Sequence, residues 1–177
     1  PESKKTISQI RKLGIKNVLM VTGDNLTTAK HIAAKLGISD IYAQILPSDK
    51  LRTIEEIKDR PVAFVGDGVN DAPVLTSADV GIALGARGST AASQSADMVI
   101  MQDDISRVAR AVEIAKRTFK IARQSILGGI VLSIALMFVF ATGKFPPLAG
   151  AIIQEAVDVI VIFNALRAHG SFRKNRA

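Results

Sequence analysis

The stretch Val65-Gly66-Asp67-Gly68-Val69-Asn70-Asp71-Ala72-Pro73 decides the fold of this 177-residue chain. It follows a short apolar run, and its glycines allow the backbone to turn sharply off a strand and to approach a ligand closely. Asp67 and Asp71 place two carboxylates on this loop, with Asn70 between them. Hard oxygen donors of this kind suit Mg²⁺, which keeps part of its water shell and binds substrate phosphate. The stretch therefore predicts a magnesium site after a buried strand.

In the first two-thirds of the chain, short apolar runs alternate with segments whose apolar residues recur at helical spacing. We expect strands at 17–21, 41–43, 62–65, 80–84 and 98–101, and helices at 1–13, 26–36, 48–57 and 91–95. Ser48 is the expected N-cap of the third helix, and the strands at 17–21 and 62–65 are expected to be buried. This alternation predicts an α/β layered domain with a mostly parallel sheet, whose ligands bind beyond the carboxyl ends of the strands.

Two further segments offer groups that bind phosphate. Thr22, Gly23 and Asp24 supply a hydroxyl and backbone N–H groups at the start of an expected helix, where the helix dipole favours anions. Lys50, near the start of another expected helix, carries a point charge suited to phosphate oxygens. Taken singly, these features are typical of a capped turn and of a solvated lysine. Together with the glycine–aspartate loop they point to a phosphate site.

The last third of the chain is of a different kind. Ile126–Ala141 is apolar except for Ser133, and a second apolar run, Leu148–Leu166, follows the pair Pro146-Pro147. A buried helical hairpin in a soluble protein is one explanation, and two helices that cross a membrane are the other. Basic residues flank the pair of runs on both outer sides: Arg117, Lys120, Arg123, Arg167, Arg173, Lys174 and Arg176. This charge placement favours the membrane hairpin, with both ends cytoplasmic.

Composition excludes several classes of protein. Hydrophobic residues make up 48% of the chain, which excludes disorder over most of its length, and the absence of cysteine excludes a disulfide scaffold, a thiolate metal site and a cysteine nucleophile. The net charge of +7 comes from basic residues that flank apolar segments, with one tyrosine and no aromatic–basic interleaving, so we expect no nucleic-acid partner. Because the chain begins with Pro1 and has no secretory signal, we expect it to be a segment of a longer protein.

Gln154, Glu155 and Asp158 lie inside the second apolar run. Ionisable groups in a membrane are costly, so they usually face a partner or a transport pathway. Glu155 and Asp158 are three positions apart, hence on one side of a helix, and with the carboxamide they form a hard oxygen site for a divalent cation. Interhelical hydrogen bonding, or an acid near the membrane surface, is the alternative explanation.

Taken in order, these residues resemble the phosphorylation domain of P-type ATPases, within the haloacid dehalogenase superfamily. The resemblance is carried by MVTGDN at 20–25, LPSDK at 46–50 and VGDGVNDAP at 65–73, and is extended by ADVGIAL at 78–84 and ADMVIM at 96–101. NALR at 164–167 is similar to the end of the last membrane helix in the heavy-metal-transporting branch.

The resemblance implies an incomplete Rossmann-like haloacid dehalogenase domain at 1–112, then a transmembrane hairpin with a basic tail at 113–177 whose helices run over about 122–142 and 147–168. It gives these roles to the matching positions: Asp67 and Asp71 as the Mg²⁺ site, Asn70 organising that loop, Thr22 and Gly23 at the phosphoryl oxygens, Asp24 supporting the turn, and Lys50 neutralising phosphoryl charge. ATP would be the substrate, bound mostly outside this chain. The α/β domain would be cytoplasmic and the hairpin would lie in lipid, in the cell membrane.

One family motif is absent. The nucleophilic aspartate of the family stands in DKTGT, which this chain lacks, as it lacks the nucleotide-binding and actuator domains. The nucleophile follows a central strand, so we expect a gap in the sheet between the strands at 18–21 and 62–65. We therefore expect the remaining N-terminal part of a pump as a partner, and no phosphoenzyme or ATP hydrolysis by this chain alone.

The second apolar run departs from familiar metal-pump patterns. The Tyr-Asn and Met/Ser pairs of copper pumps are absent, zinc and cadmium pumps usually carry Asp near position 154, and the His-Glu-Gly of cobalt-type pumps reads Gln154-Glu155-Ala156 here. A divalent transition metal is therefore the expected cargo. Two other functions stay open at this point: a membrane-tethered phosphatase of the same superfamily, and a catalytically silent membrane segment that acts by association.

Overall fold

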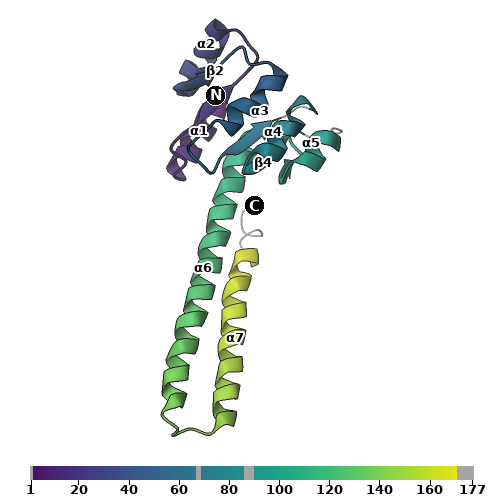
Figure 1. Ribbon diagram of the computed structural model, residues 1–177. Coiled ribbons are helices and arrows are strands. Elements are labelled where there is room, and N and C mark those ends of the chain that lie inside the picture. Colours follow the sequence, from purple (N-terminus) through teal and green to yellow (C-terminus); the bar gives the residue numbers. More distant parts are fainter. Residues whose placement is uncertain (1, 67–68, 86–89, 171–177) are drawn as a thin grey trace. The chain divides into compact units, whose positions relative to one another are not determined.

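A computed structural model of the chain describes residues 2–66, 69–85 and 90–170 (Figure 1). The chain divides into two compact units, Pro1–Val112 and Glu113–Ala177. The helices of the first unit are α1 (Glu2–Lys12), α2 (Leu26–Leu36), α3 (Pro47–Glu55), the 3₁₀ turn η1 (Val69–Asp71), α4 (Ala72–Ser77) and α5 (Thr90–Ser95). The long helix α6 (Ser106–Ala141) begins in this unit, and α7 (Pro147–Gly170) lies in the second.

The strands of the first unit form two separate parallel sheets. In one, β1 (Leu19–Val21) pairs with β2 (Asp40–Tyr42), and in the other the order is β3 (Ala63–Gly66), β4 (Val80–Leu84), β5 (Met98–Ile100). Every strand pair is parallel, as the alternation of strands and helices predicts. Within the described residues no ladder joins β1 to β3, and the break falls where the sequence places a missing strand.

One hydrophobic cluster spans the break between the two sheets. Ile54 of α3 and Val74 of α4 are each 1% exposed, and Val21 of β1 and Phe64 of β3 pack against them. Burying side chains of this size contributes about 1.5–3 kcal/mol each. Side-chain packing, rather than strand pairing, therefore holds β1 and β3 within the same unit.

The expectation that the runs 17–21 and 62–65 are buried is wrong: Asn17 is exposed, and Val18–Val21, Val62 and Phe64 are half-buried. Ala63 is exposed and Val65 is 36% exposed, whereas Gly66 at the end of the strand is buried. The reason is that, among the residues that the structure describes, β1 pairs with β2 alone and β3 with β4 alone, so the part of each strand's surface near the unpaired side is not covered.

Two helices, α3 and α4, differ from the sequence-based expectation. Helix α3 begins at Pro47 with Leu46 as its N-cap, so Ser48 is not the cap but lies inside the helix. The fixed φ of proline suits the first helical position and explains this earlier start. Helix α3 also ends at Glu55, before Ile57, and the short helix α4 follows Asp71 where the sequence predicts no helix or strand.

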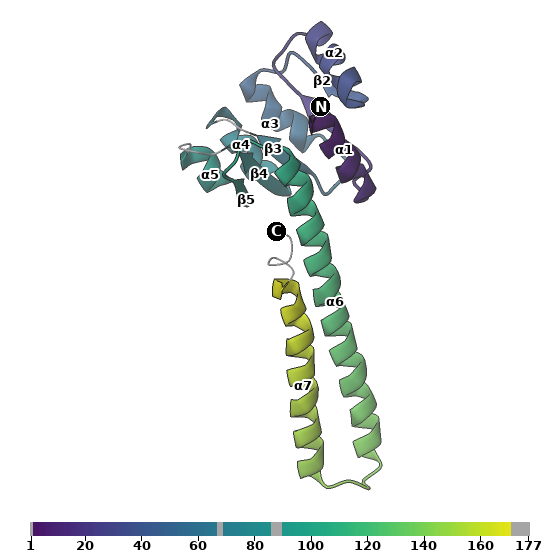
Figure 2. The ribbon, with the colours of Figure 1, turned by 180° about the vertical axis from the view of Figure 1, so that it is seen from behind.

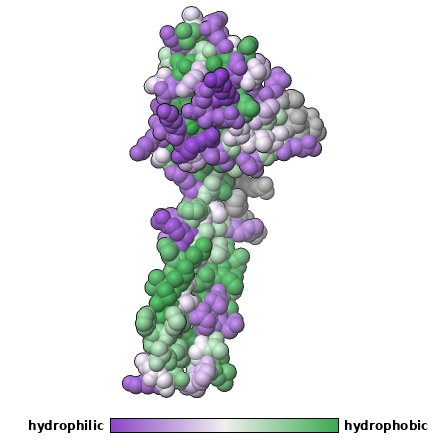
Figure 3. Space-filling model, in the orientation of Figure 1, coloured by the Kyte–Doolittle hydropathy of each residue, from purple (hydrophilic) through white to green (hydrophobic). Residues whose placement is uncertain are grey.

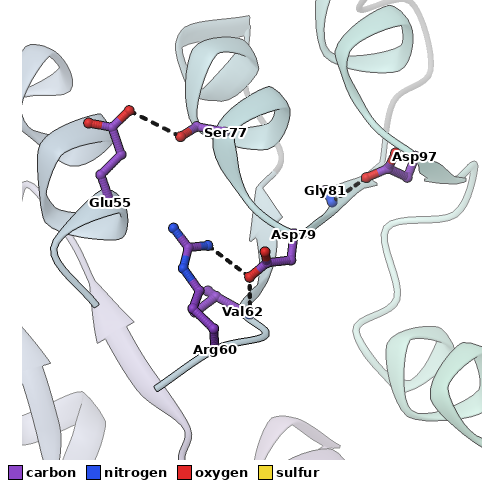
Figure 4. A network of polar contacts seen from close by, with 7 residues as sticks. All are labelled: Glu55, Arg60, Val62, Ser77, Asp79, Gly81 and Asp97. Carbon is purple, nitrogen blue, oxygen red and sulfur yellow. Dashed lines mark hydrogen bonds and ion pairs between the residues drawn. The ribbon is translucent and has the colours of Figure 1, made fainter. Parts of the chain in front are cut away.

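Two aspartates fix the starts of neighbouring strands in the second sheet (Figure 4). Asp79, just before β4, accepts hydrogen bonds from the Val62 N–H at 2.6 Å and from the Arg60 guanidinium at 2.8 Å. Asp97, just before β5, accepts one from the Gly81 N–H of β4 at 2.8 Å. Asp79 thus binds the backbone just before β3, and Asp97 binds the backbone of β4. The Val62 N–H, and then the Arg60 side chain, lower the pKa of Asp79.

In the second unit, α6 and α7 run side by side and antiparallel, as both ribbon views show (Figures 1 and 2). The helices approach closely at Gly129, where an added Cβ would meet Val161 at 3.1 Å. Both helices are long and apolar enough to cross a membrane, and only 6% of each apolar window is buried. The core helix of a soluble protein is mostly buried, whereas hydrophobic side chains cover most of this pair's visible surface (Figure 3).

Candidate phosphoryl and cation sites

An ion pair lies at the glycine–aspartate loop that follows β3. The Nζ of Lys50, in α3, lies 2.9 Å from Oδ1 of Asp71, the last residue of η1. The Asp71 side chain is 9% exposed and that of Lys50 is 21% exposed, so the lysine reaches solvent while the carboxylate is almost enclosed. A Cβ at Gly66 would lie 2.8 Å from Oδ2 of Asp71, so the buried carboxylate requires glycine at the end of β3.

The turn after β1 is tied to the segment that follows β2. The Thr22 N–H donates to the Tyr42 carbonyl at 2.9 Å, and the Thr22 carbonyl accepts from the Ile45 N–H at 3.1 Å. Within the turn, the Asp24 N–H donates to Thr22 Oγ1 at 3.1 Å. The Thr22 oxygen acts there as an acceptor, which leaves its hydroxyl hydrogen free to donate to a phosphoryl oxygen. The exposed Gly23 and Asp24 complete the turn.

The three sequence-predicted segments border the same core cluster. Val21 precedes Thr22, Leu51 follows Lys50, and Val74 is the third residue after Asp71, and all three apolar side chains belong to that cluster. Lys50 and Asp71 are in direct contact, whereas no hydrogen bond in the described part of the chain joins Thr22 to either of them. The structure therefore brings one pair together and places the third segment beside the same core.

The expected magnesium ligands are described in part. Asp67 lies outside the described residues, Asn70 is exposed on η1, and Asp71 is engaged by Lys50. No group of three His, Asp or Glu residues that could hold a metal occurs among 2–66, 69–85 and 90–170. A nearly enclosed carboxylate beside a lysine, on a loop that requires glycine, has the donor chemistry that fits Mg²⁺ together with phosphate.

In the second unit, Gln154 of α7 connects the two helices. Its Nε2 donates to Ser133 Oγ of α6 at 3.0 Å and to Oδ1 of Asp158, one turn along α7, at 3.2 Å. The sequence singles out Gln154 and Asp158, and the structure joins them. Ser133 is a partner that sequence reasoning missed, although its position as the polar residue of an apolar run is a usable signal.

A second polar contact joins the helices farther along. Asn164 Nδ2 of α7 donates to Ser125 Oγ of α6 at 2.7 Å, and Arg167 donates to Asn164 Oδ1 at 2.8 Å. Ser125 is 5% exposed. Sequence analysis missed this contact too, since it depends on how the helices are rotated about their axes.

Glu155 lies on a different face of α7. Val157 is 5% exposed and packs inward, and Glu155, two residues before it, lies about 160° round the helix from that side. Glu155 is exposed and has no hydrogen-bond or ion-pair partner among the described residues. The structure thus joins Gln154 to Asp158 and leaves Glu155 directed away from α6.

The chain is similar to several known proteins. The family model of the haloacid dehalogenase-like hydrolases matches residues 1–79. The manganese-exporting P-type ATPase of Mycobacterium leprae is 34% identical over 169 residues, which are 94% of this chain and 23% of that protein. The copper-exporting P-type ATPase B of Archaeoglobus fulgidus is 40% identical over 172 residues, 93% of this chain and 25% of that protein.

The solved structure of a zinc-transporting PIB-type ATPase in the E2.Pi state is similar over 93% of this chain and 27% of its own, with a TM-score of 0.79 and 31% identity. The chain therefore spans about a quarter of the length of the relatives it matches. Both units take part in the match, because it covers nearly all of the chain.

Proposed function

Because this chain belongs to the heavy-metal-transporting branch of the P-type ATPases, we propose that it forms part of an ATP-driven pump that exports a divalent transition metal. Residues 1–112 supply part of the phosphorylation domain, and 113–177 supply a transmembrane hairpin with a basic tail. One observation carries the proposal. A Lys50–Asp71 ion pair at the glycine–aspartate loop occurs in the same chain as the long apolar helix α7, which bears two carboxylates.

In the phosphoryl site, the residues of this chain act by position and charge. The Thr22 hydroxyl donates to a phosphoryl oxygen, and the Gly23 turn lets phosphate approach the backbone. Lys50 neutralises charge on the transferred group, and Asp71 holds Lys50 in place. Asp67, with Asp71, is the proposed Mg²⁺ ligand. The nucleophilic aspartate, and most of the ATP site, come from outside this chain.

The proposed location is the cell membrane, with the α/β unit on the cytoplasmic side. Arg117, Lys120 and Arg123 precede the apolar part of α6, and Arg167 lies at the end of α7. Both groups belong to the same side of an antiparallel helix pair, which the positive-inside rule places in the cytoplasm. Lipid is then the environment of the exposed apolar side chains.

The proposed cation site lies on α7. Glu155 and Asp158 supply carboxylate oxygens, and Gln154 stands beside them. Hard oxygen donors without any thiolate favour a divalent ion over a monovalent soft one. The related proteins are named for manganese, copper and zinc, so the divalent class is argued from the ligands and not from the names.

The test is metal-stimulated ATPase activity of the full-length protein that contains this chain, measured with Zn²⁺, Cd²⁺, Co²⁺, Ni²⁺, Mn²⁺ and Cu⁺. We expect stimulation by at least one divalent ion, and its loss in Glu155→Gln. Gln124→Glu is the matched control, because it makes the reverse substitution, amide to carboxylate, at an exposed residue of α6. This variant should retain metal stimulation. Stimulation that survives Glu155→Gln unchanged excludes Glu155 as a transport ligand. Hydrolysis of small phosphate esters without metal stimulation would indicate the phosphatase instead.

A further inference from the structure

The hydrogen-bond chain Ser133–Gln154–Asp158 links α6 to one of the two carboxylates of the proposed cation site. Gln154 is partly buried between the helices, whereas Asp158 is exposed. The contact to Ser133 crosses from α7 to α6, and the contact to Asp158 stays on α7. The carboxylate is thus held, through one amide, by a residue of the neighbouring helix.

The orientation of the Gln154 amide follows from its partners. The amide NH₂ of Gln154, and not its oxygen, faces Asp158, because Nε2 is the atom within hydrogen-bond distance of Oδ1. The same nitrogen also donates to Ser133, so both of its hydrogens are used. A cation does not approach Asp158 Oδ1 from the side on which an N–H donor points at that oxygen.

We propose that Ser133 and Gln154 are positioning residues that restrict Asp158 to binding the transported cation through a single oxygen, Oδ2. This inference rests on the proposed function. A carboxylate that offers one oxygen suits a small divalent ion, whereas larger ions take more oxygens and use both oxygens of a carboxylate. The Ser133–Gln154 pair then sets a preference for the smaller ions at the site, and Gln154 itself is not a ligand.

The second interhelical contact supplies a matched control. Asn164 donates to Ser125 as Gln154 donates to Ser133, and the two serines lie on the same helix, eight positions apart. In the described residues, Asn164 also accepts a hydrogen bond from Arg167, and neither the Glu155 nor the Asp158 carboxylate takes part in this contact. Ser125→Ala therefore removes one interhelical hydrogen bond, as Ser133→Ala does, without touching the cation site.

The experiment uses the full-length pump reconstituted in lipid vesicles. The quantity measured is the apparent KM for Cd²⁺, the largest divalent ion of the panel, divided by the KM for the smallest ion that stimulates ATPase activity. Where Cd²⁺ does not stimulate, its inhibition constant replaces its KM. We expect this ratio to fall by about tenfold in Ser133→Ala, in the range found for residues that orient metal ligands, with kcat changed less than KM. Ser133→Thr restores the hydroxyl and should restore the ratio.

Ser125→Ala should leave the ratio at its wild-type value. An unchanged ratio in Ser133→Ala, or an equal change in Ser125→Ala, overturns the inference while leaving the pump intact. If Ser133→Ala does not fold, Gln154→Met, which keeps the length and removes both donors, is measured instead and should show the same fall. Absence of metal stimulation in the wild-type protein would overturn the proposed function itself, so the two failures are distinguishable.

Discussion

The Lys50 Nζ lies 2.9 Å from the Asp71 Oδ1, and the two partners differ in exposure: 21% for the lysine side chain and 9% for the aspartate. Removing one member of an enclosed ion pair leaves the other charge without compensation. Here the enclosed member is the carboxylate, so loss of the lysine should cost more than loss of the aspartate, whose lysine partner can turn to solvent.

Lys50→Met should lower the free energy of unfolding by about 2 kcal/mol, below the range for fully buried pairs because the lysine is partly solvated. Asp71→Asn should cost less, and the double variant should recover part of the loss. The measurement is denaturant unfolding of the detergent-solubilised chain, with all four proteins in a double-mutant cycle. Strictly additive single effects would contradict a direct interaction.

Asp79 should make stability depend on pH. Its pKa is lower in the folded protein, because the Val62 N–H and the Arg60 guanidinium bind the carboxylate. Such a group contributes its full stabilisation above its unfolded pKa of about 3.9, and loses it as the pH falls through the folded value. Asp79→Asn should therefore be less stable than wild type at pH 7, and the difference should shrink below about pH 4.

Unfolding midpoints measured from pH 7 to pH 3 test this expectation. The matched control is Asp40→Asn in β2, since the Asp40 carboxylate has no hydrogen bond or ion pair in the part of the chain that is described. A difference between wild type and Asp79→Asn that stays constant over this pH range would show that the carboxylate charge plays no part.

Gly81→Ala should disrupt the contact between α4 and β4. An added Cβ would collide with the Leu75 carbonyl and lie 2.9 Å from its carbon, and these backbone atoms cannot rotate away. Overpacking of this kind costs about 1–3 kcal/mol or more. Gly128→Ala, at a glycine of α6 with nothing within 4 Å of the added carbon, should fold as the wild type does. Thermal unfolding compares the two, and equal midpoints would contradict the close packing.

The chain by itself should form no phosphoenzyme. The nucleophile motif DKTGT is absent from its sequence, and the groups of the proposed phosphoryl site that are present would act by position and charge alone. Incubation with γ-labelled ATP, followed by acid precipitation, should yield no acid-stable label on the purified chain. Addition of a complementing N-terminal part of a pump should restore labelling, and Asp67→Asn should reduce it again.

The sequence predicts the local elements of this fold well and the contacts between them poorly. The strand at 80–84 and the helix at 26–36 are found as expected, because apolar periodicity and the flanking Asn25 and Gly37 act within a few residues. Helix α4 is missed, since its six residues are too few to show helical spacing in the sequence.

The candidate sites, like the fold, are predicted as residues but not as contacts. Motif spacing singles out Lys50, Asp71 and Gln154 as candidate site residues. It does not predict which side chains each of them contacts. The Lys50–Asp71 pair depends on how α3 and η1 pack, and the Ser133–Gln154 contact depends on the rotation of two helices. Packing and rotation are set by contacts between residues far apart in the chain, which single-sequence patterns do not encode.

The separation of β1 from β3 has a practical consequence for handling the protein. Within the described ranges β1 pairs with β2 alone and β3 with β4 alone, so each presents a row of backbone N–H and C=O groups that lacks a partner strand, and Val65 of β3 is 36% exposed. Open rows of this kind recruit any extended segment, including those of other copies of the same chain. In isolation the chain should therefore self-associate through its sheets as well as through its apolar helices, and detergent alone should not keep it monomeric.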